Sequence, residues 1–176
     1  MWEWLGEALA VDFANTTKRR GAVDEELLRG PEDVSEWAAR EAGRVPALAP
    51  RDVPLPELTA FRDDVQALLH AVVRKEPAPE GAADRVNARL RAVPLVLQLR
   101  GEQAVLEPAA PAAPLGELLA RVAHSAIELA QDGEIGFCDA PSCGQFFERR
   151  RAGQRWCSDA CGTRARVARH AHRHRA

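Results

Sequence analysis

All four cysteines of the sequence lie within 24 residues near its C-terminus, with the spacing Cys138-x4-Cys143-x13-Cys157-x3-Cys161. This spacing forms two close pairs separated by a loop. Each short turn aims two thiolates at one point and the loop brings the pairs together, which is what a tetrahedral Zn²⁺ site requires. The sequence therefore predicts one structural zinc ion, held by Cys138, Cys143, Cys157 and Cys161.

Two other roles for these cysteines are less well supported by the pattern. Four cysteines close the coordination sphere, whereas a catalytic zinc has three protein ligands and an open position. The deaminase signature P-C-x-x-C with an upstream H-x-E is absent, because Pro141 precedes Ser142 and His124 is followed by Ser-Ala. A disulfide pair remains the alternative. Since no catalytic dyad, triad, phosphate loop or paired-carboxylate motif stands out, the sequence predicts a protein that is not an enzyme.

The cysteines share their segment with an excess of arginine. Residues 137–176 contain nine arginines and three acidic residues, a net charge of +6, while residues 1–136 contain 15 basic and 23 acidic residues, a net charge of −8. Such asymmetry is typical of a nucleic-acid-binding segment, although an acidic protein partner would give the same pattern. The residues predicted to contact nucleic acid are Arg149, Arg150, Arg155, Arg164, Arg166, Arg169 and Arg173.

A helix that begins at Asp159, with Ser158 as its cap, would order part of these arginines. At 100° per residue, one arc contains Gly162, Arg166, Arg169, His170 and Arg173, and another contains Cys161, Ala165, Ala168 and His172. One face can then pack while the other meets phosphate, with Gly162 allowing a backbone to approach closely. A merely solvated face is the competing interpretation.

The elements that position the cysteines are predicted to be a knuckle at the first pair, a hairpin with a turn at Ala152-Gly153, and the helix at the second pair. This order describes a treble-clef or ribbon-like zinc finger. A segment this small has few large apolar side chains, so metal binding is part of its folding free energy. Trp156 is expected either to cover the zinc site or to stack on a base.

The preceding body is predicted to be mainly helical. The apolar spacing indicates helices over 5–16, 31–43, 55–75, 83–92 and 115–131. Leu95, Leu97 and Leu99 alternate before a turn at 101–103, which predicts a hairpin. The predicted fold class is α+β, with a mainly helical N-terminal domain over 1–132 that includes a small β-hairpin, and a zinc finger over 133–176.

The N-terminal stretch MWEWLGEALAVDF has no basic region before its apolar residues and includes Glu3 and Glu7, so it does not have the pattern of a secretory signal. No stretch approaches the roughly 20 apolar residues that span a bilayer. We therefore expect a cytoplasmic protein without membrane contact.

Two stretches resemble known families. "RWCSDACGTRARVARH" resembles the CGNR zinc finger, whose members show two cysteines, then R-W-C-S, then C-G-N-R and a basic helix. "ALAVDFANT" (Ala8–Thr16) resembles the L-x-L-D-F-x-N-T opening of the ABATE domain. The resemblance implies a bacterial, stress-induced transcription regulator with a ligand-sensing domain, the four cysteines as zinc ligands and Arg164 as the motif arginine. Thr163 departs from the motif asparagine and lacks the donor–acceptor pair of an amide.

For the body, the resemblance implies a small-molecule pocket, and Asp12, Asn15, Thr16 and Arg62 are the candidate ligand-binding residues. Helix capping and ion pairing are the ordinary roles that these residue types also have. The resulting hypothesis is a zinc-containing, DNA-binding transcription regulator, which would be a homodimer if its target is palindromic.

Two alternatives remain open. One is an RNA-binding protein that stacks bases on Phe146, Phe147 and Trp156. The other is a protein-interaction module whose basic finger docks an acidic partner or its own acidic body.

Overall fold

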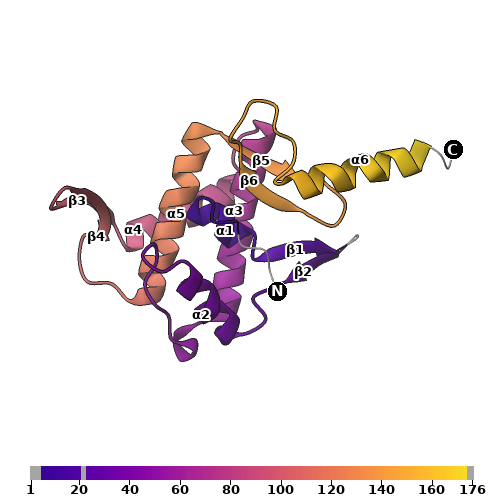
Figure 1. The fold of residues 1–176 in the computed structure, drawn as a ribbon. Helices are drawn as coiled ribbons and strands as arrows, with labels where there is room; N and C mark the ends of the chain where they lie inside the picture. The colour runs from indigo at the N-terminus through magenta and orange to yellow at the C-terminus, as the bar shows by residue number, and fades with distance from the viewer. Residues whose placement is uncertain (1–4, 21–22, 174–176) are drawn as a thin grey trace.

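The computed structural model describes residues 5–20 and 23–173, which form a helical body and a C-terminal unit from which the last helix projects (Figure 1). In chain order the body contains α1 (Leu9–Ala14), β1 (Thr17–Arg20), β2 (Val23–Glu26), α2 (Pro31–Arg40), the 3-10 turn η1 (Pro50–Asp52), α3 (Leu55–Arg74), α4 (Glu80–Ala92), β3 (Leu95–Arg100), β4 (Gln103–Pro108) and α5 (Pro114–Asp132). The C-terminal unit contains β5 (Ile135–Cys138), β6 (Gln145–Glu148) and α6 (Asp159–Arg173). The strands pair as three antiparallel hairpins within the described residues. This confirms the predicted α+β class.

The core of the body lies between α3, α5 and α1, with α4 packed against α3 and α5. On α3 the side chains of Leu58, Val65 and Leu69 are fully buried, and on α5 those of Leu118 and Val122 are too. These residues recur at intervals of four and seven, which places them on one stripe of each helix. The apolar pattern therefore predicts both long helices because burial of that stripe stabilises them.

The first helix is shorter than the sequence predicts. It begins at Leu9 rather than near residue 5, because Gly6 has a φ of +66° and turns the chain away from helical geometry. Every residue of α1 is buried, including the polar Asp12. The helix is followed by its C-cap, Asn15. The stretch Ala8–Thr16, which resembles the ABATE opening, therefore contains this buried helix.

Two hairpins extend from the helices, and the sequence predicts only one of them. The predicted hairpin β3–β4 stands apart from the body (Figure 1), with the side chains of Leu97 and Leu99 73% and 75% exposed. The unexpected hairpin is β1–β2, in which Thr17 pairs with Glu26 and Arg20 with Val23. Its sequences TKRR and VDEE contain no alternation of apolar residues, which is why the pattern does not reveal it.

The C-terminal hairpin lies earlier in the chain than the sequence predicts, because its turn falls between Cys138 and Cys143 and not at Ala152-Gly153. Strands β5 and β6 flank the knuckle between Cys138 and Cys143, and the Ala152-Gly153 turn falls in the loop that follows. Phe146 and Phe147 explain the position of β6, because adjacent strand residues point to opposite faces. Phe146 is buried in the core of the body, and Phe147 is buried in the cysteine cluster.

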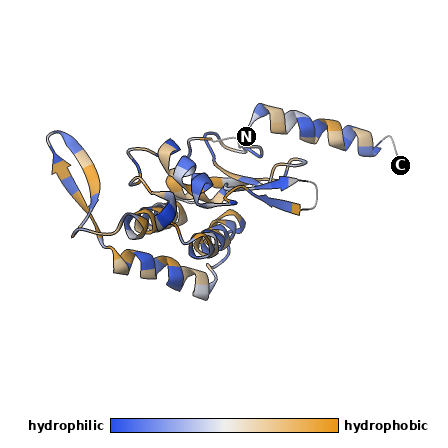
Figure 2. Cartoon of the chain, turned by 90° about the horizontal axis from the view of Figure 1, so that it is seen from below, coloured by the Kyte–Doolittle hydropathy of each residue, from blue (hydrophilic) through white to orange (hydrophobic). Residues whose placement is uncertain are grey.

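Helix α6 projects away from the rest of the molecule (Figures 1 and 2). Its buried residues are Cys161, Gly162 and Ala165, all in the first two turns. The predicted packing face therefore holds for Cys161 and Ala165 but not for Ala168 and His172, which are exposed. Within the described residues, no helix is long and apolar enough to cross a membrane.

Candidate metal centre and nucleic-acid interface

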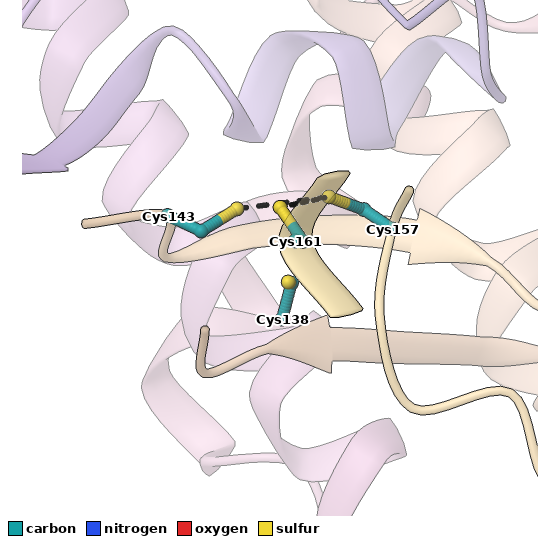
Figure 3. Close-up of side chains that lie close together, drawn as sticks. All are labelled: Cys138, Cys143, Cys157 and Cys161. Atoms are coloured by element: carbon teal, nitrogen blue, oxygen red, sulfur yellow. Dashed lines mark hydrogen bonds between the residues drawn. The ribbon is translucent and has the colours of Figure 1, made fainter. Parts of the chain in front are cut away.

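The sulfur atoms of Cys138, Cys143, Cys157 and Cys161 converge on one point, and all lie within 4.8 Å of one another (Figure 3). The Sγ atoms of Cys143 and Cys157 are 3.6 Å apart, and those of Cys157 and Cys161 are 3.4 Å apart. All four cysteines are free, and three of them are buried.

The local sequence explains how the first pair is positioned. The knuckle requires left-handed backbone at Ser142 (φ +59°) and Gly144 (φ +70°), and these are residue types that turns favour. Two main-chain hydrogen bonds close the turn, from Cys143 N–H to the carbonyl of Ala140 (3.0 Å) and from Gly144 N–H to the carbonyl of Cys138 (3.0 Å). Both thiols therefore point to the same side of the hairpin.

The second pair is positioned by the start of α6. The hydroxyl oxygen of Ser158 accepts a hydrogen bond from the N–H of Cys161 (3.3 Å), and its carbonyl accepts one from the N–H of Gly162 (3.1 Å). This is the cap that the sequence predicts for the helix. Cys157 lies just before the helix and Cys161 lies in its first turn, so both sulfur atoms face the hairpin.

The four sulfur atoms fit a zinc ion. Zn–S bonds of about 2.3 Å in a tetrahedron place sulfur atoms about 3.8 Å apart, close to the two separations given above, whereas a disulfide needs about 2.05 Å. Without a cation, the hydrogen bond between the thiols of Cys138 and Cys143 lowers the pKa of Cys138 and raises that of Cys143. The side chain of Arg164 donates a hydrogen bond to the sulfur of Cys161 (2.9 Å) and so offsets negative charge on the cluster. The cluster can hold one zinc ion.

The finger hairpin is joined to the body by a buried pair of hydrogen bonds. The side-chain amide of Asn15 donates to the carbonyl of Phe146 (2.9 Å), and the N–H of Phe146 donates to the side-chain oxygen of Asn15 (2.8 Å). Ile135 and Phe146 belong to the body's core, and the ring of His70 lies 4.7 Å from the rings of Phe137 and Phe146. The hairpin is therefore part of both hydrophobic clusters.

Two further contacts complete this junction. The N–H of Arg19, in β1, donates to the carbonyl of the zinc ligand Cys143 (3.1 Å). The N–H of Ala8 donates to a carboxylate oxygen of Glu148 (2.9 Å), 140 residues further along the chain. The sequence does not indicate these contacts, because nothing in the local pattern relates residues so distant in the chain.

The arginines proposed for nucleic-acid contact lie in two places. Arg149, Arg150 and Arg155 are exposed on the loop after β6, while Arg166, Arg169 and Arg173 share one exposed face of α6. The seventh, Arg164, contacts Cys161 as described. Within the described part of the chain, Arg150 is the one member of this set with a carboxylate partner, Glu7, at 3.6 Å. Most of the positive charge is therefore not paired with carboxylates.

Gly162 and Thr163 have specific structural neighbours. A Cβ on Gly162 would lie 3.0 Å from the ring of Trp156, so the glycine makes room for the indole rather than for an external backbone. Trp156 also packs against the cysteine cluster, as the covering role predicts. The hydroxyl of Thr163 donates to the carbonyl of Asp159 (3.0 Å) and accepts from the side chain of Arg166 (3.0 Å). At the motif asparagine position, threonine therefore helps to orient an arginine.

The structure brings two of the four candidate ligand-binding residues together. The side chain of Arg62, 4% exposed, makes two hydrogen bonds of 2.7 Å to Glu26 and one of 3.3 Å to the hydroxyl of Thr16. Burial raises the pKa of Glu26, but the hydrogen bonds from Arg62 and from the N–H of Leu28 together hold it below the ordinary value. The ion pair between Arg62 and Glu26 thus joins β2 to α3.

The other two candidates point elsewhere. Asn15 joins the finger hairpin, and Asp12 accepts hydrogen bonds from the N–H of Glu7 (3.2 Å) and the side chain of Arg44 (3.2 Å). Burial raises the pKa of Asp12 to about 7 despite these hydrogen bonds. Ligand binding by the four residues stays a prediction.

The helical body, the hairpin β5–β6 packed against it and the cysteine cluster together define a zinc-finger protein in which the finger is fixed to a larger helical domain. A family model described as "Putative stress-induced transcription regulator" (ABATE) matches residues 7–133, and the CGNR zinc finger model matches residues 135–174. The chain therefore belongs to the ABATE family and carries a CGNR zinc finger. Comparison with curated proteins gives no match. The two family descriptions name a regulator and a zinc finger rather than an enzyme, and they indicate a zinc-binding regulator.

Proposed function

We propose that this protein is a DNA-binding transcription regulator, in which the zinc cluster fixes α6 to the body and the arginines of α6 bind duplex DNA. The observation that carries the proposal is the projection of α6 from the molecule (Figure 1), with the face formed by Arg166, Arg169 and Arg173 exposed and, within the described residues, not paired with carboxylates. Charges left in this state are available for phosphates.

The dimensions of α6 suit a groove of DNA. Its 15 residues give a length of about 22 Å at 1.5 Å per residue. The major groove is about 12 Å wide and admits one helix. From Arg166 onward every described residue of α6 is exposed, so the helix can enter a groove without parting from the body. Arginines on its sides would then contact phosphates and the edges of guanine.

Salt dependence of binding tests the proposal. Wild-type protein with measured zinc content is titrated with a duplex at several salt concentrations, beside a variant with Arg166, Arg169 and Arg173 changed to Ala. We expect the logarithmic slope to become shallower by about 2–3 in the variant, because each phosphate contact contributes about 0.9. The matched control removes the same charge from the exposed body residues Arg29, Arg74 and Arg91. An equal loss in the control, or no binding by wild type, would refute the proposal.

RNA is the second candidate and is less well supported. Of the three aromatic residues proposed for base stacking, Phe146 and Phe147 are 2% and 1% exposed, which leaves Trp156. Tighter binding to single-stranded RNA than to duplex DNA in the same titration would select the RNA hypothesis. A palindromic DNA target would require a homodimer, which sedimentation of the complex detects.

We also propose that the helical body binds a small-molecule effector. A cavity of about 370 Å³ between α2 and the segment after it supports this proposal. Its lining includes Ala38, Val45 and Leu48, and none of the four candidate ligand-binding residues is part of it. This lining suits a small, mainly apolar effector. Filling the cavity by Ala42→Leu should abolish the thermal stabilisation caused by such an effector, whereas Ala92→Leu, at an exposed position of α4, should not. Stabilisation that survives Ala42→Leu would exclude this cavity.

A further inference from the structure

A second cavity lies beside the zinc cluster, between the loop after β6 and the first two turns of α6. Its volume is about 230 Å³, and its lining includes Arg151, Arg155 and Trp156 from the loop and Asp159, Gly162 and Arg166 from the helix. It shares Arg166 with the proposed DNA-binding face of α6, and Arg155 is also one of the seven arginines predicted to contact nucleic acid. Neither the zinc site nor the groove-binding role of α6 accounts for this cavity.

The loop that forms the cavity is held by its own hydrogen bonds. The side chain of Gln154 accepts from the N–H of Arg150 (3.0 Å) and donates to the carbonyl of Trp156 (3.1 Å). The N–H of Gln154 donates to the carbonyl of Arg151 (3.2 Å), and Gly153 takes a φ of +72° at the tip. The cavity is therefore built before any ligand arrives, which lowers the entropic cost of binding.

The lining combines positive charge with an aromatic ring. The lining contains three guanidinium groups and one carboxylate, that of Asp159. This carboxylate is fully exposed and lies 3.8 Å from the side chain of Arg151. Within the described residues, Arg155 and Arg166 have no carboxylate partner. The guanidinium of Arg155 lies 5.4 Å from the centre of the Trp156 ring, a cation–π contact that holds it near the indole.

We propose that this cavity binds a nucleoside monophosphate unit, with the phosphate among the guanidinium groups of Arg151, Arg155 and Arg166 and the base beside Trp156. Arginine presents a planar set of donors that matches phosphate oxygens, and indole rings stack with bases of any sequence. A volume of about 230 Å³ is below the 300–1,000 Å³ that is usual for drug-sized ligands, so the cavity has room for no more than one nucleotide.

The same chemistry has two sources. One is a nucleotide of the nucleic acid bound by α6, and for this source the inference rests on the proposed function. The other is a free mononucleotide acting as a ligand of the finger. The two are distinguished by competition: a duplex excludes the mononucleotide in the first case, whereas in the second the two bind together and weaken each other only through the shared Arg166.

The test is a titration of full-length, zinc-loaded protein with deoxyadenosine monophosphate, followed by calorimetry and by tryptophan fluorescence. Trp156→Phe identifies which part of the fluorescence signal comes from the cavity. Arg155→Ala is compared with Arg149→Ala, which removes the same charge from the same loop but does not line the cavity. Deoxyadenosine and inorganic phosphate are titrated in parallel to separate the contributions of base and phosphate.

We expect saturable binding that weakens about tenfold in Arg155→Ala, the usual loss for one charged hydrogen bond, and changes by less than about twofold in Arg149→Ala. Asp159→Asn should tighten binding, because it removes a negative charge from the lining. Equal losses in the two arginine variants, weaker binding in Asp159→Asn, or no saturation would overturn the inference. So would tighter binding of a glutamate-rich peptide than of the nucleotide.

Failure of the inference differs from failure of the proposed function. Arg173 is on α6 and outside the cavity lining, so Arg173→Ala should weaken duplex binding while leaving mononucleotide binding unchanged. Duplex binding without mononucleotide binding would retain the regulator and remove the subsite. Mononucleotide binding without duplex binding would retain the subsite and refute the proposed DNA-binding function.

Discussion

Asn15→Ala tests whether the finger and the body fold as one unit. Asn15 is 9% exposed and satisfies both main-chain groups of Phe146, at 2.8 and 2.9 Å. Alanine would leave the buried N–H and carbonyl of Phe146 without these partners. Each unsatisfied group costs about 1–3 kcal/mol, and partial access of water reduces the sum, so we expect a loss of about 2–4 kcal/mol in the free energy of unfolding.

The assay is thermal and urea unfolding of the zinc-loaded protein. For a chain of this length each kcal/mol lowers Tm by about 2–4 °C, which gives a decrease of roughly 5–15 °C. The matched control is Asn87→Ala, which changes an exposed asparagine on α4 and should alter stability by less than about 0.5 kcal/mol.

The same variant should release zinc faster to a chelator. Cys138 ends β5 and Cys143 precedes β6, so both ligands depend on the hairpin that Asn15 holds. A loss of less than about 0.5 kcal/mol with unchanged zinc release would refute the reasoning, because it would mean that the hairpin keeps its place without this contact.

Three further changes probe separate contacts. Cys157→Ser should reduce bound zinc from about one per chain to near zero by atomic absorption, because a structural site needs all four sulfur ligands; full retention would argue for a different ligand set. Gly136→Ala would place a Cβ 2.5 Å from the ring of Phe147 and should cost about 1–3 kcal/mol in urea unfolding; an unchanged midpoint would contradict this packing. Although burial raises the pKa of Glu26, Arg62 holds it below 4.5, so the unfolded chain binds more protons in acid. The stability that results is present above pH 4.5 and is lost as the pH falls through the folded pKa. Glu26→Gln should remove this part of the pH dependence of urea midpoints, and an identical dependence in the variant would exclude the pair as its source.

The features that the sequence predicts correctly have local signals. Leu58, Val65 and Leu69 repeat within one helix, and that repeat suffices to place α3. The cysteine spacing likewise places the second sulfur pair at the start of α6, because Ser158 is a capping residue at the right position. In each case the residues that signal the element are also the residues that form it.

The features that the sequence does not reveal depend on contacts between distant residues. Asn15 has the spacing of a helix-end residue, and nothing near it indicates that its partner is Phe146, 131 positions away. The sequence predicts the finger hairpin around the glycine turn at Ala152-Gly153, because Phe146 and Phe147 form a short apolar run without a visible period. Their burial in two different clusters, which fixes β6, is a tertiary effect.

The contacts between β5–β6 and the body also determine how a ligand bound to the body would act on α6. The buried residues of α6 are Cys161, Gly162 and Ala165, which lie against the cysteine cluster and Trp156, so a change in the body reaches the helix through β5–β6. A ligand shifts such an equilibrium only by its difference in affinity between the two arrangements. If DNA binds the docked arrangement, an effector that favours docking raises Tm and DNA affinity together. An effector that occupies the surface of α6 itself would raise Tm while lowering DNA affinity. The sign of the two changes, measured side by side, therefore separates sensing through the junction from direct competition.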